Sequence, residues 1–152
     1  MITEMKVRGL MFDPYNNAYI VILRVEDSAA DMLPIWVGKS EASAISFALE
    51  SVPAPRPMTH DLIKSLLDTV DAKVISVVIS DLNDNTYYAK IHLQYEDSEY
   101  SIDSRPSDAI ALALRTSAPV FASESVLKKQ TSEELEQWLE NLKPEDFGKL
   151  DS

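Results

Sequence analysis

Apolar residues along this chain follow two spacings, one typical of strands and one typical of helices. Residues 3–12 and 19–25 are rich in β-branched and aromatic residues, which favour strands. The stretch Asp13-Pro-Tyr-Asn-Asn17 between them has the residues of a turn. Residues 32–37 predict a third strand, and Pro34 favours an edge or irregular position because proline has no N–H to donate. The chain is therefore expected to open with a hairpin and a third strand.

Three segments have the small and apolar pattern of packed helices. The first is residues 39–50. Thr59 is expected to cap a second helix over residues 59–70, and Pro106 suits the first position of a third helix, where a missing N–H costs nothing. Residues 51–57 separate the first two helices and hold three prolines, so they are expected to form a surface loop.

The remaining segments complete a sheet. Extended structure is expected at residues 72–80, 87–95, 99–103 and around 119–121. The polar stretch 81–86 joins the two longer strands as a hairpin turn. The pattern predicts an α+β fold in which an antiparallel-rich mixed sheet carries three packed helices and a C-terminal amphipathic helix.

That last helix is expected over residues 131–142. Thr131 and Glu134 have the spacing of a capping box. One apolar stripe follows, made of Leu135, Trp138, Leu139 and Leu142. The stripe packs on its own domain or on a partner subunit, and the short connection favours its own domain. The expected division is a domain over residues 1–129 and a helical tail over residues 130–152.

Composition narrows the class of protein. A chain of 152 residues is one domain by length and large enough to bury its own core. Cysteine is absent, which excludes disulfides, thiolate metal sites and a cysteine nucleophile. The N-terminus lacks the basic and apolar pattern of a leader, and no apolar run reaches the length of a membrane span. We therefore expect a soluble, cytoplasmic protein.

The net charge of −11 argues against a broad nucleic-acid-binding face. Residues 131–152 carry seven acids and two bases, so part of the excess is local, but the rest of the chain is acidic too. An acidic protein that acts on nucleic acid needs a local cluster of arginines or divalent cations that bridge carboxylates to phosphate.

The richest set of polar groups lies at the start of the third helix. Ser104, Ser107 and Asp108 suit a helix start, and Asp108 also complements the positive end of the helix dipole. Capping alone accounts for these three. It does not call for Arg105, whose planar guanidinium beside free backbone N–H groups is suited to an anion such as phosphate.

Two other helix starts carry candidate residues. Glu41 falls in the first turn of its helix, where the dipole alone explains a carboxylate. His60 and Asp61 are adjacent, and histidine beside a carboxylate recurs in acid–base and metal chemistry. Successive helix residues point in different directions, so adjacency does not make them a pair.

Three motifs together resemble one family. They are Leu33-Pro-Ile-Trp-Val-Gly-Lys-Ser-Glu-Ala42, Arg56-Pro-Met-Thr-His-Asp-Leu62 and Asp103-Ser-Arg-Pro-Ser-Asp-Ala-Ile-Ala-Leu-Ala-Leu-Arg115. In this order they are similar to the bifunctional nuclease (BFN) domain family, over about residues 2–129. The resemblance implies an α+β domain and the DNase and RNase activity claimed for some members. It implies no agreed catalytic residues.

On this basis we expect a nuclease that hydrolyses phosphodiester bonds in DNA and RNA with a divalent cation, Mg²⁺ or Mn²⁺. The assigned catalytic residues are His60 and Asp108. Phosphate is assigned to Arg56 and Arg105, and metal to Glu41, Asp103 and Asp108. The expected partners are nucleic acid, bound weakly at a local site, and a second copy of the chain, with no membrane. The alternative is a non-enzymatic binding or regulatory module for a small anionic ligand or a protein partner.

Overall fold

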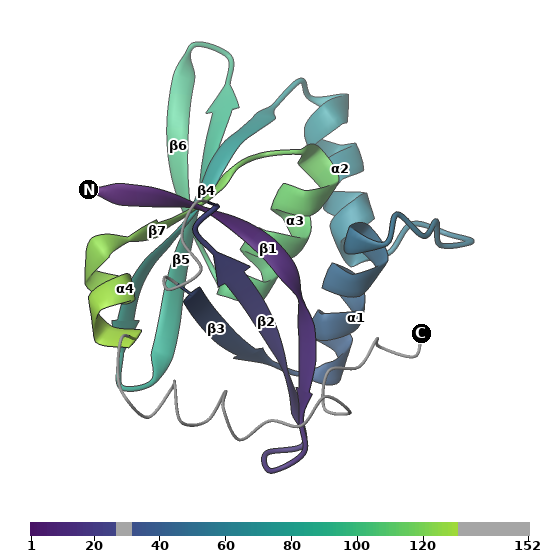
Figure 1. The fold of residues 1–152 in the computed structure, drawn as a ribbon. Helices are drawn as coiled ribbons and strands as arrows, with labels where there is room; N and C mark the ends of the chain where they lie inside the picture. The colour runs from purple at the N-terminus through teal and green to yellow at the C-terminus, as the bar shows by residue number, and fades with distance from the viewer. Residues whose placement is uncertain (27–31, 131–152) are drawn as a thin grey trace.

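The computed structural model describes residues 1–26 and 32–130, and the helix predicted over residues 131–142 lies outside them. A seven-stranded mixed sheet forms the body of the fold, in the order β3-β2-β1-β7-β4-β5-β6 (Figure 1). The elements in chain order are β1 Ile2–Asp13, β2 Ala18–Arg24, β3 Met32–Val37, α1 Lys39–Leu49, α2 Thr59–Thr69, β4 Lys73–Asn83, β5 Thr86–Tyr95, β6 Ser98–Ser104, α3 Pro106–Thr116, β7 Val120–Ser123 and α4 Glu124–Gln130. The α+β class is confirmed.

Neighbouring strands are antiparallel with one exception. β4 and β7 run parallel, with Val77 opposite Val120, while all other pairs are antiparallel. β7 lies between β1 and β4, so this short strand joins an N-terminal half of the sheet to a C-terminal half. β3 lies at one edge, where Pro34 is tolerated, as predicted.

The β4–β5 hairpin closes through two residues with left-handed backbone. Asp84 and Asn85 have φ of 50° and 64°, the conformation of the type I′ turns that match the twist of a hairpin. Asn and Asp tolerate this conformation better than most residues. The predicted polar turn is confirmed, and it lies beside the site described below.

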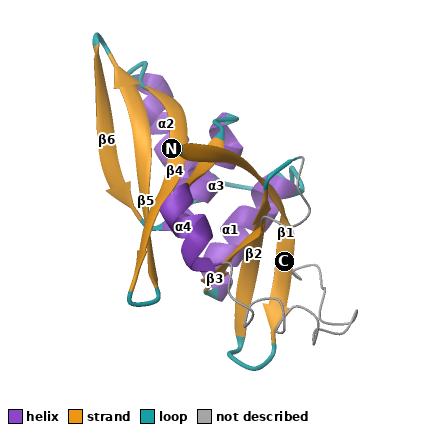
Figure 2. Cartoon of the chain, turned by 60° about the vertical axis from the view of Figure 1, so that its left-hand side comes forward, coloured by secondary structure: helices purple, strands orange, loops and turns teal. Residues whose placement is uncertain are grey.

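Three helices pack on one side of the sheet (Figures 1 and 2). α3 is the central one, because it contacts α1, α2, β4 and β5. Its body is buried and consists of small and branched apolar residues, Ala109, Ile110, Ala111, Leu112 and Ala113. Alanine on several faces lets neighbours approach closely, so α3 joins the other helices to the main core.

Two details differ from the sequence prediction. Thr59 is the first residue of α2, and Met58 holds the N-cap position with an extended backbone. The carboxylate of Asp61 accepts the Met58 N–H at 2.9 Å, so a side chain of the first turn, and not Thr59, bonds a backbone N–H at this helix start. α4 was not predicted. It crosses the expected boundary at residue 129, and its Val126 is fully buried in the main core.

Candidate functional site

The starts of three helices converge on one hydrogen-bonded network. α1 follows β3 directly at Gly38, α2 follows the proline-rich loop, and α3 follows the edge strand β6. Each contributes polar groups from its first turn or its N-cap. The network therefore joins residues 41, 60, 105 and 108, which lie far apart in the sequence.

Arg105 is the centre of this network. Its Nε and Nη2 donate to the two carboxylate oxygens of Asp108 at 2.9 and 3.2 Å. Its Nη1 donates to Glu41 Oε1 at 3.4 Å, which is a longer and weaker contact. The Arg105 side chain is 63% exposed, so the bidentate pair with Asp108 orders the guanidinium while leaving it open to solvent.

His60 completes the network from α2. Its Nε2 lies 3.0 Å from Asp108 Oδ1, and its side chain is only 9% exposed. Burial raises the pKa of Asp108, but hydrogen bonds from Arg105 and His60 outweigh that effect and hold the pKa below its ordinary value. Asp108 is therefore an acceptor at neutral pH, and His60 donates to it through Nε2–H.

Asp108 serves these side chains instead of the helix end. α3 has no side-chain cap hydrogen bond, although Arg105 holds its N-cap position. Helix capping was one of two interpretations of this stretch. Helix capping does not explain why Asp108 bonds the side chains of Arg105 and His60.

His60 and Asp61 bind different partners on α3, as the divergence of neighbouring helix residues requires. Asp61 Oδ1 accepts from Arg115 Nε at 2.7 Å. Arg115 also donates to the Ala111 carbonyl at 3.0 Å, and its side chain is 7% exposed. The sequence reasoning missed this ion pair. The signal was present, because a buried arginine in an otherwise apolar helix needs a carboxylate.

A cavity of about 300 Å³ opens beside Arg105 and Glu41. Its walls come from the end of β3, the β4–β5 turn and the starts of α1 and α3. Trp36, Tyr87 and Ser107 also line it, so aromatic and polar groups surround the guanidinium. The cavity has the size of a small-ligand site, although its mouth is open.

Glu41 is held close to the backbone at the start of α1. A Cβ added to Gly38 would lie 2.5 Å from Glu41 Oε2, so only glycine leaves room for this carboxylate position. Gly38 thus does more than mark a junction between strand and helix. It lets the Glu41 carboxylate fold back over the helix start, within reach of Arg105.

Two assigned residues lie outside the network. Asp103 is exposed on β6 opposite Lys90, and Arg56 is exposed in the proline-rich loop. Neither side chain forms a hydrogen bond or ion pair in the part of the chain that the structure describes. No group of three or more histidines and carboxylates able to hold a metal ion occurs among residues 1–26 and 32–130. Because Arg105 already bonds both Glu41 and Asp108, these residues do not fit a preformed metal centre.

The sequence matches the family model of the bifunctional nuclease domain over residues 21–134. The chain belongs to this family. The match includes α1, α2 and α3, so the network of Arg105 lies within the bifunctional nuclease domain. Among its described helices, none is long and apolar enough to cross a membrane.

Relatives of two kinds share the domain. An uncharacterized protein of Mycobacterium tuberculosis is 32% identical over 163 residues, covering 95% of this chain and 97% of the relative. Bifunctional nuclease 1 of Oryza sativa is 29% identical over 105 residues, covering 67% of this chain and 32% of the relative. Bifunctional nuclease 2 of Arabidopsis thaliana is 28% identical over 103 residues, covering 66% and 31%.

The extents of these similarities differ. This chain spans about a third of the length of the plant relatives. The mycobacterial similarity leaves out only about 5% of this chain, which is less than residues 131–152 make up. The mycobacterial similarity therefore extends into residues 131–152, most of which lie beyond residue 134, where the match to the family model ends.

Proposed function

We propose that this bifunctional nuclease domain hydrolyses phosphodiester bonds in DNA and RNA, with the substrate phosphate bound by Arg105 at the mouth of its cavity. The observation that carries the proposal is the geometry of Arg105, an exposed guanidinium that Asp108 orients and that faces a cavity with aromatic walls. A planar, oriented fork matches two phosphate oxygens.

The longer contact of Arg105 is the one that a phosphate would replace. Nη1 is 3.4 Å from Glu41, whereas the bonds to Asp108 are shorter and bidentate. A phosphate oxygen can therefore replace Glu41 as the acceptor of Nη1 while Asp108 keeps the guanidinium in place. The guanidinium would then stabilise the charge that develops on the phosphoryl oxygens during hydrolysis.

His60 is assigned to proton transfer. With Nε2–H donated to Asp108, its Nδ1 carries the lone pair. Nδ1 makes no hydrogen bond within the described residues. Every fully buried side-chain nitrogen or oxygen in those residues has a partner, so Nδ1 is not fully buried and reaches solvent. It is the nitrogen that would take the proton of the attacking water as the bond from phosphorus to the leaving sugar oxygen breaks. Arg56 would contact a phosphate farther along the strand.

The alternative is a binding module in which Arg105 holds a small anion or a carboxylate of a protein partner without chemistry. The specific observation in its favour is that Arg105 bonds both carboxylates of the network, and that the described residues contain no group of three or more histidines and carboxylates able to hold a metal ion. Nuclease assays on highly purified protein, with and without EDTA, separate the two functions. Cleavage that EDTA abolishes supports the predicted Mg²⁺ or Mn²⁺ requirement, and no cleavage of DNA or RNA under either condition supports the module.

Nucleic-acid affinity should depend only weakly on salt. Arg105 and Arg56 are the cations assigned to phosphate in a chain of net charge −11, so few counterions are released on binding. The slope of log affinity against log salt should correspond to about two phosphate contacts, and Arg105→Ala should reduce it by roughly one unit. Fluorescence titrations at several salt concentrations measure this slope. A steep slope that Arg105→Ala leaves unchanged would point to a different basic surface.

We also propose a homodimer, because apolar side chains of α2 and of its C-cap residue face solvent. Leu62, Leu66 and Val70 are spaced by four residues and are 53%, 60% and 53% exposed. A stripe of this kind marks an interaction surface. Light scattering should give twice the monomer mass for the natural chain and the monomer mass for Leu66→Glu. An unchanged mass in that variant would remove α2 from the interface.

A further inference from the structure

The N-terminal half of the sheet has a second, smaller apolar cluster on the face turned away from α1. Side chains alternate along β2, and Val21 and Leu23 point into the main core. The opposite face carries a separate cluster made of Met11, Ile20 and Ile22, with Met32 packed against it. The three residues of this cluster are each less than 9% exposed, so this face also buries apolar side chains, unlike the wet face of a one-sided sheet.

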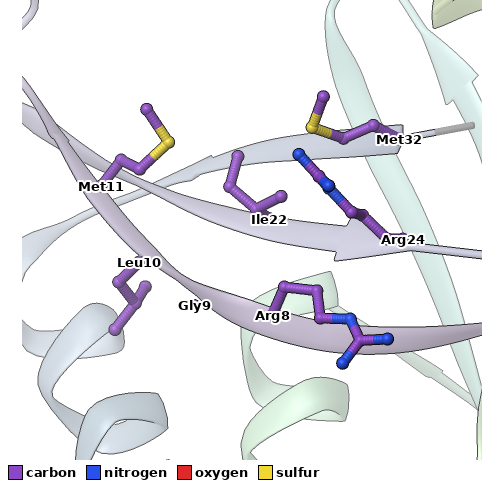
Figure 3. A pocket seen from close by; sticks show the side chains of 7 residues that line it. All are labelled: Arg8, Gly9, Leu10, Met11, Ile22, Arg24 and Met32. Atoms are coloured by element: carbon purple, nitrogen blue, oxygen red, sulfur yellow. The ribbon is translucent and has the colours of Figure 1, made fainter. Parts of the chain in front are cut away.

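A pocket of about 480 Å³ opens on this face (Figure 3). Met11, Ile22 and Met32 form its apolar part, and the side chain of Arg24 lies beside Met32. Arg8 lies across the pocket on β1. The pocket therefore combines methionine and isoleucine side chains with two cations.

A bulge in β1 helps to form this pocket. The register with β2 shifts between Val7 and Gly9, so Arg8 is the extra residue. Gly9 has φ of 157°, and a Cβ there would meet nothing within 4 Å, which shows open space at the pocket wall. Neither the Arg8 nor the Arg24 side chain forms a hydrogen bond or ion pair in the described ranges. The bulge thus places the Arg8 cation beside apolar surface, and neither arginine has a side-chain partner among the described residues.

The same chain carries a segment with the complementary composition. Residues 131–142 contain the apolar stripe of Leu135, Trp138, Leu139 and Leu142. Residues 131–152 have seven acids and two bases, and Glu134 and Glu136 flank the stripe on a helical projection. Apolar side chains match the methionine surface, and the glutamates match the two arginines.

The connection to this segment is short. It follows α4 directly, and α4 contacts β3, the strand on which Met32 lies. Part of residues 131–152 is also shared with the mycobacterial relative, although the match to the nuclease domain ends at residue 134. A segment joined to a helix that contacts β3 has a far higher effective concentration at this sheet than any separate protein.

We propose that residues 131–142 dock on this face of their own chain, with the apolar stripe over Met11, Ile22 and Met32 and the flanking glutamates facing Arg8 and Arg24. The docked segment covers the N-terminal half of the sheet on the side opposite α1. It acts as a permanent cover of the β1–β2–β3 face, away from the network of Arg105.

A fluorescent label tests this placement in the full chain. Because the chain has no cysteine, Lys6→Cys accepts a single bimane label beside the pocket, opposite Arg24 in the β1–β2 register. Tryptophan quenches bimane on contact. We expect the label to emit severalfold less light in the presence of Trp138 than in the background Trp138→Phe. The same label at Gln94→Cys, on β5 in the other half of the sheet, should emit equally in both backgrounds.

Two further measurements decide the outcome. Arg8→Glu together with Arg24→Glu should raise the emission at position 6 toward the Trp138→Phe level, since both contacts of opposite charge are reversed. Mixing labelled Trp138→Phe protein with excess unlabelled natural chain should leave the emission unchanged. Equal emission with and without Trp138 would overturn the docking, and quenching in the mixture would show that a second copy supplies the segment.

Discussion

Replacing Asp61 with alanine should lower the free energy of unfolding by about 2–3 kcal/mol, because the change removes a helix cap and leaves the guanidinium of Arg115 buried with one carbonyl partner. The loss is smaller than that of a fully buried ion pair because the Asp61 side chain is 38% exposed. Urea denaturation monitored by circular dichroism measures it through the shift in midpoint.

Asp68→Ala is the matched control on the same helix. Asp68 accepts from Lys64 at 2.8 Å, but both side chains are exposed, so its removal should cost about 0.3–0.5 kcal/mol. If the two variants unfold at the same urea concentration, the contact between Asp61 and Arg115 does not hold α2 to α3.

The pH dependence of the same contact has a defined sign. Hydrogen bonds from the Met58 N–H and from Arg115 lower the pKa of Asp61 in the folded chain. The resulting stability is present above the ordinary carboxyl pKa and is lost as pH falls through the lower, folded value. Asp61→Asn should therefore lose less stability than the natural chain between neutral and acid pH.

Asp108→Asn should abolish or strongly reduce nuclease activity while changing the free energy of unfolding by about 1 kcal/mol or less. Asparagine keeps the shape of the side chain but removes the negative charge. The carboxylate that bears this charge orients Arg105 and accepts a hydrogen bond from His60. Cleavage rates on DNA and RNA, measured beside a thermal melt, separate the loss of chemistry from a loss of folding.

Asp68→Asn supplies the control for this variant too, since it removes one exposed carboxylate from the same acidic chain. Its activity should match that of the natural protein. Full cleavage by Asp108→Asn would exclude Asp108 from the reaction and favour the binding module.

The sequence predicted most elements because their local patterns agree with the final fold. β3 matches its predicted range, α1 and α2 match theirs to within a residue, and α3 begins at Pro106 as predicted. α4 was missed because seven residues with two lysines show little periodicity, and its burial depends on Val126 reaching the main core. Short helices of this kind are stabilised by tertiary contact rather than by their own composition.

The site was predictable in its residue types but not in its pairing. Arg105 and Asp108 stood out at one helix start, yet nothing local indicates that Glu41 reaches the same guanidinium across 64 positions. Nor does the sequence separate His60, which binds Asp108, from Asp61, which binds Arg115. Those contacts follow from how α2 crosses α3, and helix crossing depends on packing that no single segment encodes.

The place of β7 in the sheet has a consequence for the order in which this chain folds. β7 begins at residue 120, pairs with both β1 and β4, and lies next to the N-terminus, where the Glu124 N–H donates to the Met1 carbonyl at 3.2 Å. A chain emerging from the ribosome therefore presents β1 with an open edge until most of the domain has been made. Pairing over such a separation is slow to form. Because β7 joins the two halves of the sheet, we expect the N-terminal strands and β4 to be held in one sheet only after residue 120 has been made.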